Sequence, residues 1–316
     1  MSTKITVIGA GSVGSAITND IMVQGIASEV VLIDINKEKA MGEAMDIYQG
    51  APFCAPAIIR SGDYEDAAGS QIVIITSGVP RKPGQTRLEL AQTNVNILKE
   101  ITPQIVRYAP DAIYILVSNP VDILTYVFTK ISGIPENRIL GSGTVLDTSR
   151  LQSELAKRFH ISPKNVHAHV YGEHGDSSFI PWSLATIANN KIDDYRNNVA
   201  DPSRIRWSKD DHQAVEDFVK QSGAQVIKSK GATFYAVAIS VCHICKCILN
   251  GSGTALTVST MMHGEYGVDD VCLSTLALVG SNGVHTKIIS PLTAEETEKM
   301  RSSARKLKEI IDGLDI

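Results

Sequence analysis

A glycine-rich turn near the amino terminus constrains the fold more than any other feature of this chain. The turn at residues 9–14, with the sequence GAGSVG, follows an apolar run, Ile5–Ile8, and opens a stretch with helical spacing, Ser15–Gln24. A second apolar run, Val30–Ile33, ends in Asp34, twenty residues after the last glycine of the turn. This order of strand, glycine turn, helix, strand and acid is typical of a dinucleotide-binding unit.

Each residue type in this unit has a physical task. Gly9 makes the tight turn, Gly11 lets the backbone approach a pyrophosphate, and Gly14 lets helix and strand pack closely. The free N–H groups at the helix N-terminus favour the negative charge of the phosphates. Asp34 is placed to bind both ribose hydroxyls and to repel a 2′-phosphate, so the sequence predicts NAD rather than NADP. The alternative, a glycine-rich turn that binds nothing, does not explain the complete pattern.

The composition is that of an ordinary globular chain. Of the 316 residues, 43% are hydrophobic and 20% are charged, and the formal net charge of −4 gives no basic footprint for nucleic acid. No apolar run reaches the roughly 18 residues that span a bilayer, and the amino terminus has no signal-peptide pattern. We therefore expect a cytoplasmic protein with neither a membrane nor a nucleic-acid partner.

Five cysteines fit a reducing compartment. Three of them lie in the segment CHICKC at residues 242–247, which invites a metal site. The segment is part of an apolar stretch, residues 231–250, that is typical of a buried helix, and no second ligand pair stands at zinc-site spacing. We therefore expect no metal, and cysteines that pack as small hydrophobic residues.

Apolar runs and helical patterns alternate in the first part of the chain, as a parallel sheet requires. The strand candidates are residues 5–8, 30–33, 57–59, 72–76, 112–117 and 139–140, and helices are expected at 37–48, 88–108 and 121–131. The sequence predicts an α/β fold, with a doubly wound parallel sheet of the Rossmann type over residues 1–143. Its ligand would lie at the carboxyl ends of the strands.

The pattern changes near Thr144. The sequence predicts helices at residues 144–159, 208–228 and 233–249, and strands at 182–188, 255–262 and 272–279. A capping box of Thr293 and Glu296 begins the last helix, which runs to about Ile311. We expect residues 144–316 to form a second, α+β domain that carries the substrate site and the catalytic groups.

Three side chains of this second domain indicate acid–base chemistry. In the helix from Thr144, large apolar residues recur every four positions, and Asp147 lies on the same buried face. A buried carboxylate needs a partner, and His174, between two glycines in the segment GEHGD, is the candidate. Such a pair can give or take a proton near neutral pH. Arg150, one turn from Asp147, has a fork that matches a carboxylate. The alternative for Asp147 and His174 is a purely structural ion pair, and the alternative for Arg150 is an arginine that simply lies at the surface.

A cationic loop follows the strand candidate at residues 72–76. Residues 77–87 hold two glycines, two prolines and three cations, with no acid. We interpret the loop as a lid that closes on an anionic substrate and excludes water. In that role Arg87 would polarise a substrate carbonyl, and Arg81 would face the group beyond the reacting carbon.

The sequence resembles the L-lactate/L-malate dehydrogenase family over nearly its whole length. The motifs that carry the resemblance lie at residues 9–14, 34, 62–64, 80–87, 118–120, 143–150 and 172–176. The resemblance implies His174 as proton donor and acceptor, oriented by Asp147, with Arg150 on the substrate carboxylate and Arg87 on the carbonyl. It also implies a small 2-oxo or 2-hydroxy acid as substrate, NAD as cofactor, and a homo-oligomer, either a dimer or a tetramer.

Further contacts follow from the same resemblance. Substrate contacts are implied for Arg81, Asn119 and Thr233. The contacts implied for NAD are Gly9, Gly11, Ser12, Val13, Gly14, Asp34, Tyr64, Thr76, Ser77, Gly78, Asn94, Val117 and Asn119.

Within the family the motifs are mixed. Residues 141–148, Glu173, residues 181–183 and Thr233 resemble the lactate branch, whereas Arg81 stands where malate enzymes carry arginine and lactate enzymes usually carry glutamine. The resemblance therefore implies reduction of pyruvate to L-lactate. Oxaloacetate reduction to malate, or dual specificity, is the alternative.

Three further points bear on function. NAD-dependent glycosidases share this type of fold but need a metal held by cysteine and histidine, and no cysteine neighbours residues 118–120. A retired dehydrogenase that only binds NAD is a non-enzymatic alternative, opposed by the retention of all four expected catalytic residues. His167 matches one half of the family's sugar-bisphosphate site, but Gln152 stands at the arginine position, so activation by that route is not predicted.

Overall fold

The structure is a computed structural model that describes residues 3–80 and 84–316. Its first part alternates strands and helices, as the apolar pattern predicts. In chain order the elements are β1 (Lys4–Ile8), α1 (Ser12–Val23), β2 (Glu29–Ile33), α2 (Lys37–Tyr48), β3 (Ile58–Ser61), β4 (Ile72–Ile75), α3 (Arg87–Tyr108), β5 (Ile113–Leu116), α4 (Val121–Ile131) and β6 (Ile139–Gly141).

The second part mixes helices with antiparallel strands. Its elements are α5 (Val145–Phe159), β7 (Val166–His167), β8 (Thr186–Ile187), β9 (Asn190–Lys191), α6 (Asp211–Lys230), α7 (Tyr235–Leu249), β10 (Thr254–His263), β11 (Asp269–Gly280), β12 (Gly283–Lys287) and α8 (Ala294–Ile311). The last helix begins after the capping box that the sequence predicts, with Thr293 as its N-cap.

One nine-stranded sheet runs through the molecule in the order β12-β11-β10-β6-β5-β4-β1-β2-β3. The six strands from β3 to β6 are parallel, and their spatial order 3-2-1-4-5-6 confirms the doubly wound sheet. The second part extends this sheet with the antiparallel strands β10, β11 and β12, and it joins at the pair Ser259 and Gly141. The two parts are therefore packed as one body, and a separate small sheet holds β7, β8 and β9.

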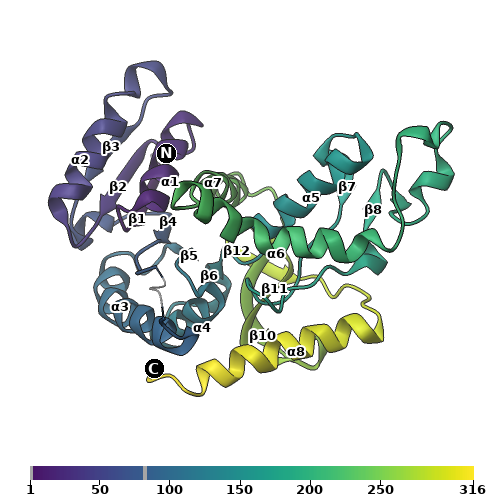
Figure 1. Ribbon diagram of the computed structural model, residues 1–316. Coiled ribbons are helices and arrows are strands. Elements are labelled where there is room, and N and C mark those ends of the chain that lie inside the picture. The colour runs from purple at the N-terminus through teal and green to yellow at the C-terminus, as the bar shows by residue number, and fades with distance from the viewer. Residues whose placement is uncertain (1–2, 81–83) are drawn as a thin grey trace.

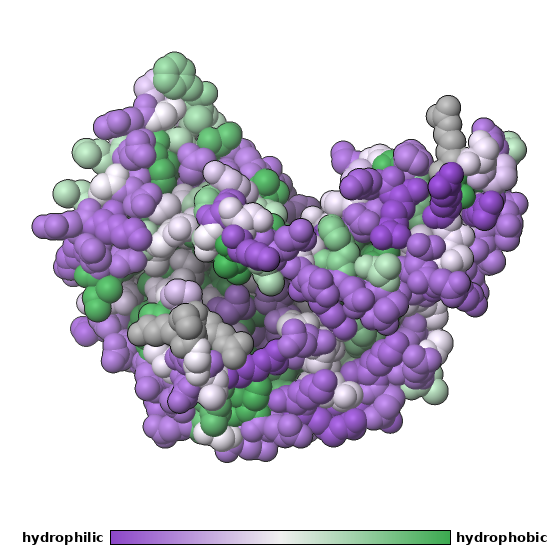
Figure 2. Space-filling model, viewed as in Figure 1, coloured by the Kyte–Doolittle hydropathy of each residue, from purple (hydrophilic) through white to green (hydrophobic). Residues whose placement is uncertain are grey.

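Helices cover both faces of the large sheet, as Figure 1 shows. One apolar core lies between the sheet and α3, α4 and α8, and another lies between the sheet and α1, α2 and α7. Strand β4 is buried along its whole length, which explains its unbroken run of branched apolar residues. A third core fills an outer lobe built on α5, α6 and the small sheet. The surface is hollowed between this lobe and the first part of the chain (Figure 2).

The predicted strand at residues 182–188 is largely wrong. Trp182–Leu184 form a 3₁₀ turn, and only Thr186 and Ile187 pair as a strand. The backbone N–H groups of Leu184 and Ala185 bond to carbonyls three residues earlier in the chain, so they are not available to a neighbouring strand. The indole of Trp182 stacks on His212 at 4.0 Å and donates to Glu216. The apolar residues here are buried by packing within the outer lobe rather than by a sheet.

Candidate active site

Helix α5 brings an acid to a histidine from a distant loop. Asp147 lies in the first turn of α5, 6% exposed, on the face that buries Leu151 and Leu155. Its Oδ2 lies 2.5 Å from Nδ1 of His174. The His174 side chain is 26% exposed. With Nδ1 held by the acid, the second ring nitrogen, Nε2, is the one left for a ligand.

The charges around His174 favour its protonated form. The negative charge of Asp147 raises the pKa of His174 to about 9, against burial, which lowers it; the Asp147 hydrogen bond and the charge of Asp122 also raise it, and Arg150 lowers it. Burial raises the pKa of Asp147, but the charges and hydrogen bonds of His174 and Arg150 outweigh burial and hold that pKa below its usual range. The imidazole is therefore charged, and its partner carboxylate ionised, at neutral pH.

The second oxygen of Asp147 is held by an arginine on the same helix. Arg150 donates from Nη1 to Oδ1 of Asp147 at 2.6 Å, and only 18% of the arginine side chain is exposed. Helix α6 runs beside it, since a Cβ built on Gly223 would lie 3.5 Å from Nη2 of Arg150. The acid, the histidine and the arginine thus form one continuous group.

A second arginine reaches the histidine loop from the first domain. Arg87 is the first residue of α3, whose N-terminus is fixed by the capping box of Thr86 and Glu89. Its guanidinium binds the carboxylate of Asp176 and lies 3.9 Å from Glu173. Both acids flank His174 in the chain, so that Arg87 lies at the same site. Arg81 is outside the described residues.

The glycine turn has the shape that a bound pyrophosphate needs. A Cβ on Gly14 would lie 1.8 Å from the carbonyl oxygen of Gly9, and one on Gly9 would lie 2.6 Å from Oγ1 of Thr76, so both positions exclude a side chain. A Cβ on Gly11, in contrast, would have no neighbour within 4 Å. Gly11 is the N-cap of α1, so the open space lies at the helix N-terminus, where anions bind. The turn therefore fits a dinucleotide.

Asp34 lies beside this turn at the end of β2. Its two carboxylate oxygens accept hydrogen bonds from the backbone N–H of Ala10, at 2.6 Å, and of Asn36, at 2.8 Å. Burial raises the pKa of Tyr64, and the negative charge of Asp34 raises it further. The acid is thus fixed between the glycine turn and α2.

The other residues expected at NAD gather at the same edge of the sheet. Thr76, Ser77 and Gly78 follow β4, Val117 and Asn119 follow β5, and Ser12 and Val13 begin α1. Two of the expected residues hold loops together: Thr76 donates to the carbonyls of Ile8 and Gly9, and Asn94 bonds to the backbone of Val79 and Asn119. The peptide between Asn119 and Pro120 is cis. Thr233 is half-buried in the loop between α6 and α7.

Two residues that contact the His174 loop were not predicted from the sequence. Asp122, in the first turn of α4, accepts the backbone N–H of His174 at 2.7 Å. The hydroxyl of Ser303, in α8, accepts the backbone N–H of Glu173 at 2.9 Å. The available signal for Asp122 was its place within an apolar helix, because a charged residue there is buried and must have partners.

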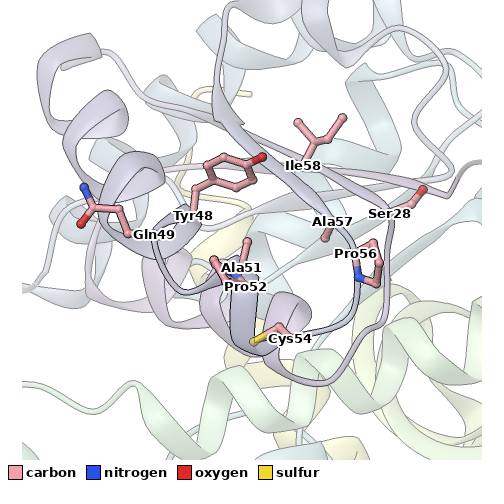
Figure 3. Close-up of a pocket in the computed structure, with 9 residues that line it drawn as sticks. All are labelled: Ser28, Tyr48, Gln49, Ala51, Pro52, Cys54, Pro56, Ala57 and Ile58. Atoms are coloured by element: carbon pink, nitrogen blue, oxygen red, sulfur yellow. The ribbon is translucent and has the colours of Figure 1, made fainter.

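A cavity of about 900 Å³ lies away from this site (Figure 3). Ser28 precedes β2 and Ala57 precedes β3, so the cavity lies at the amino ends of these strands, whereas the glycine turn lies at a carboxyl end. The residues that line it include no acid, histidine, lysine or arginine. Tyr48 and Cys54 are the titratable side chains that line it, without a charged partner in the lining, and we do not assign the chemistry to this cavity.

Residues 3–80 and 84–316 contain no group of three or more His, Cys, Asp or Glu side chains that could hold a metal ion. All five cysteines are free thiols, and Cys242, Cys245 and Cys247 are buried in α7.

Within the same described ranges, no helix has both the length and the apolar character that crossing a membrane requires.

Two family models together match almost the whole chain. The NAD binding domain of lactate/malate dehydrogenases matches residues 3–141, and the α/β C-terminal domain of the same enzymes matches residues 144–314. L-lactate dehydrogenase 1 of Clostridium acetobutylicum is 47% identical over 313 residues, which cover 99% of each chain. An L-lactate dehydrogenase of Clostridium botulinum is 47% identical over 312 residues, which cover 99% of this chain and 97% of its own length.

Solved structures agree with these matches. The crystal structure of MGS-M5, a lactate dehydrogenase from a Medee basin deep-sea metagenome library, has a TM-score of 0.94 and 36% identity, with 99% of each chain covered. The minor L-lactate dehydrogenase of Enterococcus mundtii, in its ligands-bound form, has a TM-score of 0.94 and 38% identity, with 100% of this chain and 99% of its own covered. The chain therefore belongs to the lactate/malate dehydrogenase family, and it carries that family's NAD-binding domain at its amino end.

Proposed function

We propose that this chain is an NAD-dependent L-lactate dehydrogenase that reduces pyruvate to L-lactate with NADH. The observation that carries the proposal is the contact of His174 with Asp147. Nδ1 of the imidazole lies 2.5 Å from Oδ2 of the carboxylate, and Arg150 donates to the other oxygen of the same carboxylate. The reduction of a 2-oxo acid requires a proton donor for the carbonyl oxygen and a cation for the carboxylate, and these two groups lie side by side here. Full-length similarity to proteins named L-lactate dehydrogenase favours pyruvate among such acids.

The residues divide the reaction among them. Arg150 binds the substrate carboxylate through its fork, and Arg87 moves from its acidic partners to polarise the carbonyl oxygen. Nε2 of His174 gives its proton to that oxygen, and Asp147 keeps the ring oriented and stabilises its charge. Asn119 and Thr233 contact the substrate. When bound, NADH supplies the hydride that the carbonyl carbon receives, so one hydride and one proton together make the alcohol.

The glycine turn, Asp34 and the loops after β4 and β5 hold the cofactor. Gly11, Ser12 and Val13, between the constrained glycines Gly9 and Gly14, would hold the pyrophosphate. Asp34 binds the adenosine ribose near Tyr64. The strand-end residues Thr76, Ser77, Gly78, Asn94, Val117 and Asn119 hold the remainder of NAD, directly or by fixing the loops.

We expect a strong preference for NADH over NADPH. The Asp34 carboxylate would face the 2′-phosphate, and such a like-charge contact costs several kcal/mol, so kcat/KM with NADH should be higher by at least about a hundredfold. Asp34→Ser should reduce the ratio of kcat/KM for NADH to that for NADPH. Asp46→Ser, which changes an exposed acid of α2, should leave this ratio unchanged. Comparable kcat/KM values for the two cofactors in the parent would mean that Asp34 does not contact the ribose.

The decisive assay measures the oxidation of NADH from its absorbance, with pyruvate and with oxaloacetate as separate substrates. Turnover with pyruvate supports the proposal. Turnover with oxaloacetate alone would make the chain a malate dehydrogenase instead. NADH binding without turnover of either substrate would leave a protein that only binds NAD.

Arg81 favours some oxaloacetate reduction besides pyruvate reduction. In the sequence it stands in the cationic loop ahead of Arg87, where its charge suits a second carboxylate but not a methyl group. Arg81→Gln should shift the ratio of kcat/KM toward pyruvate by at least about tenfold, or about 1.4 kcal/mol. Lys82→Gln, which removes the adjacent cation, should leave the ratio unchanged. An unchanged ratio in Arg81→Gln would show that Arg81 does not face the substrate.

A homo-oligomer, either a dimer or a tetramer, is part of the proposal. Two groups of large hydrophobic side chains are exposed on helices, and such faces are typical of interfaces: Met41, Met45 and Tyr48 on α2, and Val226, Ile227, Tyr235 and Ile239 on α6 and α7. Figure 2 shows hydrophobic surface at the upper left, over the end of α2. Sedimentation of the purified protein tests this part of the proposal. A cytoplasmic location is proposed from the five free thiols.

We place the domain boundary between residues 143 and 144. Gly143 has a φ of +51°, and a Cβ there would lie 2.4 Å from Oγ of Ser274, so the chain makes a turn that only glycine fits. Residues 1–143 would then carry the cofactor, and residues 144–316 the substrate and the proton relay.

A further inference from the structure

The loop between α6 and α7 is closed by an ammonium group that lies against two aromatic rings. Nζ of Lys230, the last residue of α6, lies 3.6 Å from the ring centroid of Phe234 and 3.9 Å from that of Tyr235. The two ring centroids are 4.4 Å apart, and the ring planes are inclined at 58° to each other. Both distances from the ammonium lie well within the range of a cation–π interaction, so one cation contacts two rings at once.

This contact connects the two ends of the loop that carries Thr233. Gly231 caps the C-terminus of α6 with a φ of +86°, and its N–H donates to a carbonyl within that helix. Phe234 is the N-cap of α7, and its carbonyl accepts a backbone N–H from the first turn of that helix. Each end of the loop thus bonds inside its own helix, and the ammonium of Lys230 joins the two ends across Thr233.

Helix α6 relates this loop to the substrate anchor. About two turns before Lys230, α6 passes Arg150, since a Cβ built on Gly223 would lie 3.5 Å from Nη2 of that arginine. Arg150 is the proposed partner of the substrate carboxylate, and Thr233 is a proposed contact of the same substrate. A displacement of the loop relative to α6 therefore changes the space between these two contacts, which the rest of the substrate occupies.

We propose that Lys230 is a positioning residue of the reaction, which fixes the Thr233 loop through the rings of Phe234 and Tyr235 and so limits the size of the 2-oxo acid that fits. The proposal rests on the proposed function. Thr233 is then held at a fixed distance from Arg150, so that a short substrate side chain is accommodated and a longer one is crowded. Lys230 does not itself contact the substrate, and it acts through Thr233.

A lysine at this position is favoured for two physical reasons. The C-terminus of a helix carries partial negative charge, and the basic residues in the last turn of α6 are Lys228 and Lys230. The methylene stem of a lysine can cover apolar surface while the ammonium keeps its water. Lys230 is exposed, and so is Tyr235, so loss of their contact leaves the apolar cores intact. Substitutions of Lys230 therefore test its position without unfolding the protein.

Two variants of Lys230 separate the charge from the length of the side chain. Lys230→Met keeps a long unbranched side chain without the cation, and kcat/KM for pyruvate should fall about two- to fivefold, mostly through KM. Turnover of 2-oxobutyrate, which is one methylene longer, should fall less, because a looser loop gives it room. The ratio of kcat/KM for pyruvate to that for 2-oxobutyrate should therefore fall by at least about twofold. Lys230→Arg keeps a cation for the rings and should retain the ratio of the parent.

Lys228→Met is the matched control, because it removes the other cation in the last turn of α6. It should leave both kcat/KM values at those of the parent. The Thr233→Ala background tests the route: because Lys230 acts through Thr233, the added Lys230→Met change should no longer alter the ratio. A loss of folded protein would lower kcat/KM for both substrates by the same factor, so the ratio distinguishes a positioning role from a structural one.

The proposal is overturned if Lys230→Met leaves the ratio unchanged, if Lys230→Arg alters it as much as Lys230→Met does, or if the shift persists in the Thr233→Ala background. Backbone hydrogen exchange provides a measurement that needs no turnover. The amides of residues 232–235 should exchange faster in Lys230→Met than in the parent or in Lys228→Met, and equal rates would reject the role of Lys230. A parent that turns over no 2-oxo acid rejects the proposed function, whereas the exchange rates still show whether Lys230 fixes the loop.

Discussion

Replacement of His174 by asparagine is expected to lower turnover of pyruvate by about 10²- to 10⁴-fold and to leave NADH binding unchanged. The reason is the division of tasks between the domains. The glycine turn and Asp34, which belong to the first domain, hold the cofactor, whereas the proton comes from the imidazole beside Asp147. Asparagine retains polarity and approximate size, but it cannot donate a proton as an acid.

The chain offers a matched control in His212. Its Nε2 lies 2.8 Å from Oδ1 of Asp193, so it forms a second histidine–aspartate pair, but in the outer lobe, where the ring stacks on Trp182. His212→Asn should leave kcat and KM close to those of the parent. Stopped-flow single turnovers measure the chemical step directly. Activity of His174→Asn within a few-fold of the parent would show that another group supplies the proton.

The alternation of the first domain could be predicted because each element carries its own pattern. The helices α2 and α4 begin and end at the residues that the sequence predicts, and the strands are buried apolar runs. The doubly wound order follows from the βαβ rule once the elements are known. Strands β7, β9 and β12 were not predicted, and β8 lay inside a predicted strand that was largely wrong. Strand β12 has five residues, mostly partly or fully exposed, and β7, β8 and β9 have two residues each, too few to show a period.

The site could be predicted in part for a similar reason. Asp147 shares a helical face with buried leucines, so its burial is a local property of the sequence. The hydrogen bond of Asp122 to the His174 backbone joins residues 52 apart in the chain, and no local pattern encodes such a pair. The ion pair of Arg87 with Asp176 is likewise a long-range contact, at a sequence separation of 89. Sequence identifies the chemical groups, but only the fold identifies their partners.

Loss of the substrate anchor is expected to be the other large effect. Arg150→Gln should lower kcat/KM for pyruvate by about 10²- to 10³-fold, because a desolvated carboxylate without its cation costs about 3–5 kcal/mol. Most of this loss should come from KM, since the contact exists in the ground state as well as in the transition state. Arg150→Lys keeps the charge but loses the two-pronged guanidinium, so its kcat/KM for pyruvate should lie between those of the parent and of the glutamine variant.

The pH profile separates this role of Arg150 from a purely structural one. Arg150 lowers the pKa of His174, so the glutamine variant should keep the imidazole protonated to higher pH, and the alkaline limb of the reduction should move upward. Arg158→Gln is the matched control on the same helix, because Arg158 binds Glu154 and Asp211 instead of the site. Steady-state kinetics with pyruvate across a range of pH measure both the KM and the position of the alkaline limb. A KM within about threefold of the parent in Arg150→Gln would mean that the substrate carboxylate lies elsewhere, since loss of a desolvated ion pair predicts a far larger change.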